Sequence, residues 1–91
     1  MAMVVRKGNA DAGAIFVLTR RPDGRVALYG PSPELETGIR RWRLVVAEAA
    51  EAESLADKRL VREADIDPDL WIVEIEDREG RHFLGEFLEA E

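Results

Sequence analysis

The residue best suited to acid–base chemistry is His82, the single histidine of this 91-residue chain. An imidazole titrates near neutral pH, and a nearby carboxylate is the minimum partner for a general acid–base pair. Asp77 and Glu79 lie shortly before His82, in a segment with the composition of a turn. No nucleophilic side chain is obviously paired with it, and the chain contains no cysteine. We therefore interpret His82 as a surface histidine at a strand end and expect no catalytic site.

Carboxylates are the second group of side chains that could do chemistry. Glu74 and Glu76 lie on one face of a predicted strand, about 7 Å apart at a rise of ~3.4 Å per residue. Asp67, Asp69 and Asp77 flank that strand. Carboxylate oxygens suit Mg²⁺ or Ca²⁺, but the spacing of an EF-hand loop is absent and basic neighbours are expected. We therefore predict neither a metal site nor a cofactor.

Arginines are the third group, because guanidinium groups bind phosphate and carboxylate through paired hydrogen bonds. An anion-binding patch could be built from Arg20, Arg21, Arg40, Arg41 and Arg43. Arg41 and Arg43 alternate with Trp42 on one predicted strand. We expect Arg41 or Arg43 to face Glu74 or Glu76 across neighbouring strands, where opposite charges stabilise a sheet. The candidate interaction residues are Arg41, Arg43, Glu74, Glu76 and His82.

The distribution of charge bears on whether these arginines pair internally or bind a ligand. The net charge is −6, but residues 1–46 hold eight basic and four acidic residues, and residues 47–91 hold five and fifteen. Such asymmetry can mark a nucleic-acid surface, yet the whole chain would repel phosphate at long range. We therefore favour pairing between basic strands of the first half and acidic strands of the second.

The element that must position the acidic candidates is a predicted hairpin over residues 70–84, at the centre of a small sheet. The side chains expected to point one way are those of Trp71, Val73 and Ile75, with the acidic residues on the other face. This period of two is typical of a half-buried strand. Gly80 suits a turn, and residues 81–84 would return antiparallel. We expect Trp71 to be the main anchor of the core.

Four further strands are predicted over residues 3–6, 14–20, 25–29 and 39–47. The first is a short edge strand, whereas the second is an apolar run typical of a strand buried on both faces. The segment Arg21-Pro22-Asp23-Gly24 is typical of a turn that joins the second of these strands to the third. Gly8 and Gly13 resemble the start of a phosphate loop, but no Lys-Ser/Thr ending follows, so we interpret that segment as a turn.

One helix is predicted before Pro68, which forces the preceding residue out of helical conformation. Residues 48–53 are rich in Ala and Glu, and helical spacing predicts an apolar stripe at Ala52, Leu55, Ala56, Leu60 and Ala64. The chain is therefore predicted to form a single α+β domain over residues 1–91, an antiparallel sheet of five to six strands with one helix packed on one face. Trp42 and Trp71 are assigned to its core.

Three segments, at residues 6–17, 28–31 and 67–74, carry a resemblance to a known family. The first begins Arg6-Lys7-Gly8-Asn9-Ala10-Asp11-Ala12-Gly13, and the last begins Asp67-Pro68-Asp69-Leu70-Trp71. Together they resemble the small bacterial proteins called domain of unknown function 1491. The resemblance covers nearly the whole chain and implies a small α+β protein without an established activity, catalytic residue or cofactor. Family members often carry an additional helical segment before the Arg-Lys-Gly motif, so the resemblance implies that one face of this sheet is less covered.

No apolar run approaches the ~20 residues that cross a membrane, and the N-terminus lacks the pattern of a signal peptide. The absence of cysteine fits a reducing compartment. We therefore expect a cytoplasmic protein and no membrane partner.

Self-association is the function that we expect. Apolar residues 15–18 face both sides of the predicted sheet, and a single helix covers only one side. Exposed apolar patches beyond a few hundred Å² usually mark an interface. We predict a non-catalytic interaction module, a homodimer formed through the sheet face or the edge strand at residues 3–6. The alternative is binding of an anion or a nucleic acid through the arginine-rich strands.

Overall fold

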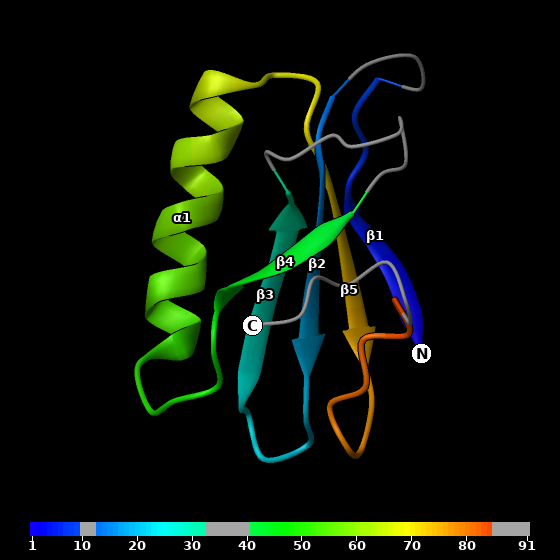
Figure 1. The fold of residues 1–91 in the computed structure, drawn as a ribbon, viewed down its shortest axis with the longest axis vertical. Helices are drawn as coiled ribbons and strands as arrows, with labels where there is room; N and C mark the ends of the chain where they lie inside the picture. Colours follow the sequence, from blue (N-terminus) through cyan, green and yellow to red (C-terminus); the bar gives the residue numbers. More distant parts are fainter. Residues whose placement is uncertain (10–12, 33–40, 85–91) are drawn as a thin grey trace.

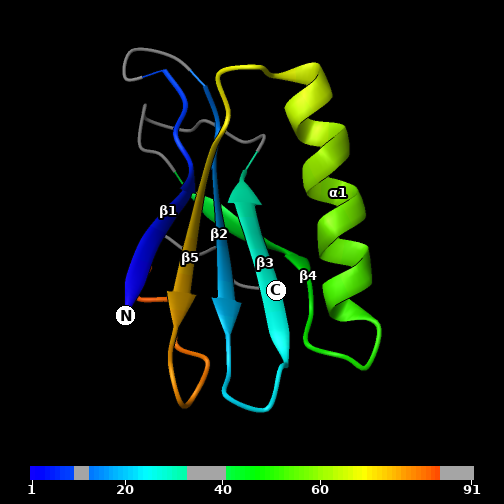
Figure 2. The same ribbon diagram turned by 180° about the vertical axis from the view of Figure 1, so that it is seen from behind.

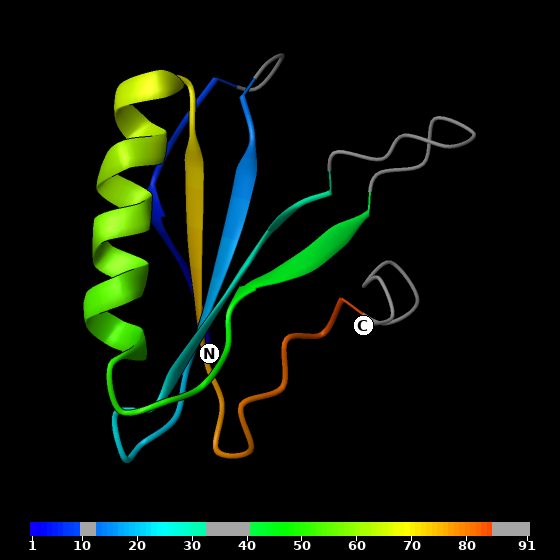
Figure 3. The same ribbon diagram turned by 60° about the vertical axis from the view of Figure 1, so that its left-hand side comes forward.

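The computed structural model describes residues 1–9, 13–32 and 41–84, which form five strands and one α-helix (Figure 1). In chain order the elements are β1 (Ala2–Arg6), β2 (Ile15–Arg20), β3 (Val26–Pro31), β4 (Trp42–Val46), α1 (Ala52–Ile66) and β5 (Trp71–Glu76). The strands form one sheet in the order β1-β5-β2-β3-β4, and α1 lies on one side of it (Figures 1 and 3). The predicted α+β class, with five strands and one helix, is confirmed. Parts of the predicted turn at 8–13 and strand at 39–47 lie outside the described residues.

The predicted all-antiparallel sheet is wrong, because β5 runs parallel to β2. β5 is antiparallel only to β1, its neighbour on the other side. The strands β2, β3 and β4 form an antiparallel meander, so β4 and β5 point the same way, and α1 connects them. Parallel strands need a crossover connection, which is usually a helix, because a short turn cannot join them. The sheet is therefore mixed.

The hairpin predicted over residues 70–84 does not form. Its turn is present, since the Gly80 N–H donates to the Asp77 carbonyl at 3.1 Å and Gly80 has a φ of 70°. Residues 81–84 then form no strand, and Phe83 takes a φ of 61°, outside the extended region. The reason is topological: β5 already has β1 on one edge and β2 on the other, so no edge remains for a return strand.

The hairpin between β2 and β3 is confirmed. Its turn closes through the Gly24 N–H, which donates to the Arg21 carbonyl at 3.0 Å, and Gly24 has a φ of 89°. An Asp23 carboxylate oxygen accepts the Arg25 N–H at 3.0 Å. These are the interactions that Asp and Gly supply to turns of this kind.

The larger part of the core lies between the sheet and α1. Its buried members are Phe16, Leu18, Val26, Leu28, Ala52, Ala56, Leu70 and Ile72. A smaller cluster on the opposite face is built on Val17, Ala27 and Tyr29 and is partly covered by Ile15, Trp42, Leu44, Ile75 and Leu84. Strand β2 contributes to both clusters, so the prediction that this strand is buried on both faces is confirmed.

The role predicted for Trp71 as the main core anchor is wrong. Trp71 is only half-buried, and its indole N–H donates to the Asn9 carbonyl at 2.8 Å. The core positions in this part of the chain are Leu70 and Ile72, which belong to the cluster under α1. Trp71 alternates with Ile72 along β5 and so lies on the other face of the sheet, where Ile75 packs against the smaller cluster. Trp42 is also half-buried, but it packs against the smaller cluster.

The helix α1 begins at Ala52 and ends before Asp67, whose N–H donates to the Glu63 carbonyl at 2.8 Å. Ala52 and Ala56 are fully buried, as the apolar stripe predicted, whereas Leu55 is 49% exposed and lies on the flank of that stripe. Among the described residues, no helix has the length and apolar character needed to cross a membrane.

Candidate functional site

The predicted pairing of Arg41 or Arg43 with Glu74 or Glu76 is wrong. Strands β2 and β3 lie between β4, which carries Arg43, and β5, which carries both glutamates. The partner of Glu74 is Arg20, with 3.5 Å between Arg20 Nε and Glu74 Oε1. This follows from the parallel pairing of β2 with β5, which the sequence pattern did not indicate.

The arginines considered for an anion-binding patch are divided between different parts of the molecule. Arg20 also contacts Glu53 of α1 at 3.1 Å, and Arg21 contacts Glu48 at 2.6 Å. Arg40 lies outside the described residues. Arg41 and Arg43 are exposed, and neither forms an ion pair with a residue that the structure describes. Arg20 at the end of β2 and Arg21 directly after it therefore connect the sheet to α1 and to the segment that precedes α1.

His82 is not paired with the carboxylates that precede it. Its ring packs edge-on against Tyr29, with 5.0 Å between ring centroids and 61° between planes. Its Nδ1 accepts the N–H of Leu84 at 2.9 Å. Because one nitrogen is occupied by the backbone and the ring packs on an aromatic side chain, His82 supports the chain segment that covers the smaller core cluster.

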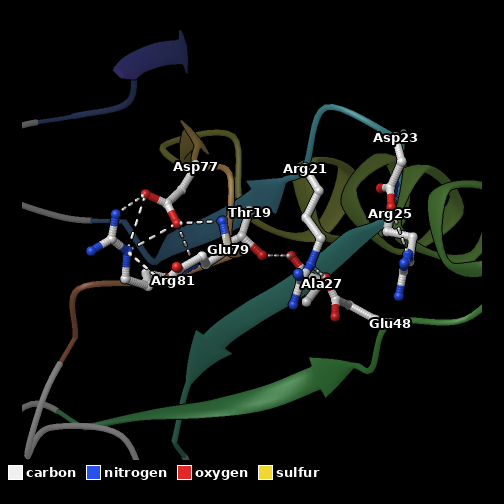
Figure 4. Close-up of polar contacts among 9 residues, drawn as sticks. All are labelled: Thr19, Arg21, Asp23, Arg25, Ala27, Glu48, Asp77, Glu79 and Arg81. Atoms are coloured by element: carbon white, nitrogen blue, oxygen red, sulfur yellow. Dashed lines mark hydrogen bonds and ion pairs between the residues drawn. The ribbon is translucent and has the colours of Figure 1, made fainter.

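Asp77 holds the turn after β5 (Figure 4). Its carboxylate accepts the backbone N–H groups of Glu79 and Arg81, both at 3.0 Å, and the Arg81 guanidinium at 2.9 Å. The Arg81 side chain, followed by these backbone donors, holds the pKa of Asp77 well below its usual range. The close-up also shows the Arg21–Glu48 ion pair. Because its oxygens accept hydrogen bonds from these protein donors, the Asp77 carboxylate stabilises the turn. Within the described chain, no three His, Asp or Glu side chains are grouped as metal ligands would be.

Described parts of the segments 6–17 and 67–74, namely residues 6–9, 13–14 and 67–71, pack on each other and form what we call the motif clasp. A carboxylate oxygen of Asp67, Oδ2, accepts the Ala14 N–H at 2.9 Å, and its other oxygen accepts the Asp69 N–H at 3.0 Å. The Arg6 guanidinium donates to the Pro68 carbonyl at 2.9 Å. The motif residues therefore join the start of β2 and the end of β1 to the entrance of β5.

Both glycines of the first motif lie directly against the carbonyl of Asp69. A Cβ atom at Gly8 or Gly13 would overlap that carbonyl, and Gly13 also has a φ of 100°. The Asn9 N–H donates to the same carbonyl at 3.2 Å. Close backbone contact, and not phosphate binding, thus accounts for the glycine spacing.

The first surface that could hold a partner is the free edge of β1. Figure 2 shows β1 as the outermost strand of the sheet, and the strand order ends with it. The consecutive side chains of Met3, Val4 and Val5 are 44%, 55% and 57% exposed. The helix packs over β3 and β4, at the other end of the sheet, and leaves this edge uncovered.

The backbone geometry of β1 determines which of its groups face outward. Met1 and Glu76 exchange both backbone hydrogen bonds, at 2.8 and 2.7 Å. Because bonded and non-bonded pairs alternate along an antiparallel ladder, the N–H and C=O groups of Ala2 and Val4 point away from β5. The free edge therefore offers two donors and two acceptors beside exposed apolar side chains.

The second surface is a groove between α1 and β4, which we call the α1–β4 groove. It has a volume of about 500 Å³ and is lined by Val45, Val46, Ala47, Leu55, Lys58, Arg59 and Arg62. No motif or pattern in the sequence indicates a site at this position. The spacing of its helical residues (i, i+3, i+4 and i+7) places them on one face of a helix, but only the topology brings β4 beside that face.

The comparisons with known proteins concern nearly the whole chain. Residues 1–85 match the family model described as "Protein of unknown function (DUF1491)". The crystal structure of a DUF1491 family protein from Caulobacter crescentus CB15 is 43% identical, with a TM-score of 0.78 over 99% of this chain and 80% of that chain. An NMR structure of a DUF1491 family protein from the same organism is 39% identical, with a TM-score of 0.73 and the same coverage.

A third solved structure, of a protein from A. tumefaciens in solution, is 39% identical and has a TM-score of 0.78, over 100% of this chain and 81% of that chain. Comparison with curated proteins gives no match. The resemblance inferred from the motifs is confirmed, since the family model and the similar structures agree. The chain therefore belongs to the DUF1491 family of proteins of unknown function.

Proposed function

We propose that this protein is a non-catalytic interaction module that self-associates as a homodimer through β1. One observation carries the proposal: the terminal strand of the sheet exposes three consecutive apolar side chains, Met3, Val4 and Val5. Exposed edge strands are usually protected by charge, by a proline, by a β-bulge or by a covering segment, because their free N–H and C=O groups bind other strands. The register of β1 against β5 shifts only between Val4 and Arg6, so the pairing from Ala2 to Val4 is regular. Residues 2–5 of β1 contain neither a charge nor a proline.

The geometry supports an antiparallel pairing centred on Met3. Ala2 and Val4 would each exchange backbone hydrogen bonds with the partner subunit, so that Ala2 lies opposite the partner's Val4. The two-fold axis of such a pairing is perpendicular to the sheet, as expected for an isologous contact. The result would be one continuous sheet of ten strands with both helices on the same face.

The other contact considered from the sequence, the sheet face opposite α1, receives less support. That face is partly covered by the chain itself, because Trp42, Leu44 and Leu84 pack against its buried cluster. None of the described residues covers the edge of β1 in this way, and its side chains are the more exposed. We therefore place the proposed interface at the edge strand.

Sedimentation equilibrium at tens of micromolar tests the proposal. We expect twice the monomer mass of 10.2 kDa for the wild-type protein and the monomer mass for Val4→Lys, because a lysine on an edge strand opposes pairing. Val61→Lys is the matched control, since Val61 is 67% exposed on α1 and should leave the dimer intact. A monomeric wild type, or a Val4→Lys variant that remains dimeric, would refute the proposed interface.

A further inference from the structure

The α1–β4 groove combines an apolar floor with a concentration of positive charge. Of the seven described residues that line it, three are basic and none is acidic, although the whole chain has a net charge of −6. We propose that this groove binds a segment of a partner protein in which apolar side chains are flanked by carboxylates. The apolar side chains would contact Val45, Val46 and Leu55, and the carboxylates would pair with Lys58 and Arg62.

Within the part of the chain that the structure describes, only one of the three basic residues of the groove forms an ion pair. Arg59 pairs with Glu63 at 2.8 Å, one turn along the helix. Lys58 and Arg62 are exposed, and neither forms an ion pair with another described residue. They are four residues apart on α1, where two like charges destabilise a helix. An acidic segment in the groove would relieve this repulsion and match the charge of the site.

The floor of the groove is apolar because of two local features. On β4 the register shifts by one residue against β3, since Val46 pairs with Leu28 and Leu44 with Tyr29. This bulge lets both Val45 and Val46 pack toward the core under α1. On the helix, Leu55 remains 49% exposed beside them. The groove volume of about 500 Å³ lies within the range of about 300–1,000 Å³ that is typical of ligand sites.

An acidic peptide fits this groove better than a nucleic acid does. None of the described residues that line the groove is aromatic, as base stacking would require, and its floor consists of valine and leucine where a phosphate backbone would need polar donors. The net charge of −6 also disfavours a polyanion at long range, whereas a short acidic segment needs only local complementarity. The site does not depend on the proposed dimer, because β1 and β4 are opposite ends of the sheet (Figure 2).

Selection from a displayed library of random peptides tests the proposal. The wild-type protein should enrich sequences that combine Asp or Glu with large apolar residues. The affinity of a recovered peptide, measured by fluorescence anisotropy, should fall about tenfold or more in Lys58→Glu/Arg62→Glu. The control Lys7→Glu/Arg78→Glu makes the same change in net charge at exposed sites away from the groove and should retain binding. Leu55→Gln should weaken binding while leaving every charge in place.

Three results would overturn the inference. The first is enrichment without acidic residues, or no enrichment at all. The second is an equal loss of affinity in the two double variants, which would indicate a general effect of charge. The third is binding of a single-stranded oligonucleotide or of anionic vesicles that depends on Lys58 and Arg62 while the selected peptides bind without them. Circular dichroism of each variant establishes that it is folded before the comparison.

Discussion

Replacing Asp67 by alanine removes the acceptor at the centre of the motif clasp. The carboxylate accepts one N–H from Ala14 at 2.9 Å and one from Asp69 at 3.0 Å, and both groups are partly buried. The first of these bonds joins residues 53 positions apart in the chain. Without the carboxylate, the Ala14 N–H just before β2 and the Asp69 N–H just before β5 lose their acceptor.

The expected cost follows from the two hydrogen bonds. A hydrogen bond to a charged group contributes about 1.5–3 kcal/mol, and partial exposure of Asp67 favours the lower end, so Asp67→Ala should lose about 3 kcal/mol. For a domain of this size, each kcal/mol lowers the melting temperature by about 4–8 °C. A fall of about 12–24 °C is therefore expected. The stability of Asp67→Asn should lie between that of the wild type and that of Asp67→Ala, because the amide oxygen can still accept one of the two hydrogen bonds.

Urea unfolding followed by tryptophan fluorescence measures the loss. Asp65→Ala is the matched control, since Asp65 is exposed in the last turn of α1, where an acidic side chain opposes the helix dipole. That variant should be as stable as the wild type or slightly more so. If Asp67→Ala unfolds at the wild-type urea concentration, the clasp does not stabilise the fold in the way described.

Three further predictions concern other parts of the fold. Leu28→Ala truncates a side chain with 0% exposure and should destabilise the protein by about 2–5 kcal/mol in urea unfolding, so a loss under 1 kcal/mol would contradict the assigned core. Gly8→Ala forces a Cβ against the Asp69 carbonyl and should cost about 1–3 kcal/mol, whereas an unchanged unfolding midpoint would show that the contact is loose. Because the pKa of Asp77 is lowered in the folded state, its stabilising effect should be present above pH about 4 and be lost at lower pH. The difference in stability between wild type and Asp77→Asn should accordingly narrow on acidification, and a constant difference would exclude this linkage.

Local patterns in the sequence were sufficient for most elements of the fold. The apolar run over residues 15–18, the Pro-Asp-Gly turn and the stop at Pro68 each act within a few neighbouring residues, and the structure confirms them. The order of the strands could not be read in this way. The insertion of β5 between β1 and β2 depends on contacts between segments far apart in the chain, which a period of two does not encode.

The same limit explains the errors at the candidate site. The alternation in β5 correctly separates Trp71 from Ile72, but it does not say which face receives the helix. The ion pairs expected between β4 and β5 required these strands to be adjacent. Because β5 instead pairs in parallel with β2, Glu74 forms its ion pair with Arg20. The α1–β4 groove was not predicted, because its floor and its basic rim come from two elements that only the fold brings together.

Hydrogen exchange of the β1 amides, followed by NMR at several protein concentrations, tests the proposed homodimer most directly. The Val4 N–H points away from β5 and would bond to the partner subunit, whereas the Met3 N–H faces Glu74 in the same chain. Exchange at Val4 should slow as the protein concentration rises, while Met3 stays protected throughout. A Val4 amide that exchanges at the unprotected rate at every concentration would contradict self-association through this edge, even if the protein sedimented as a dimer.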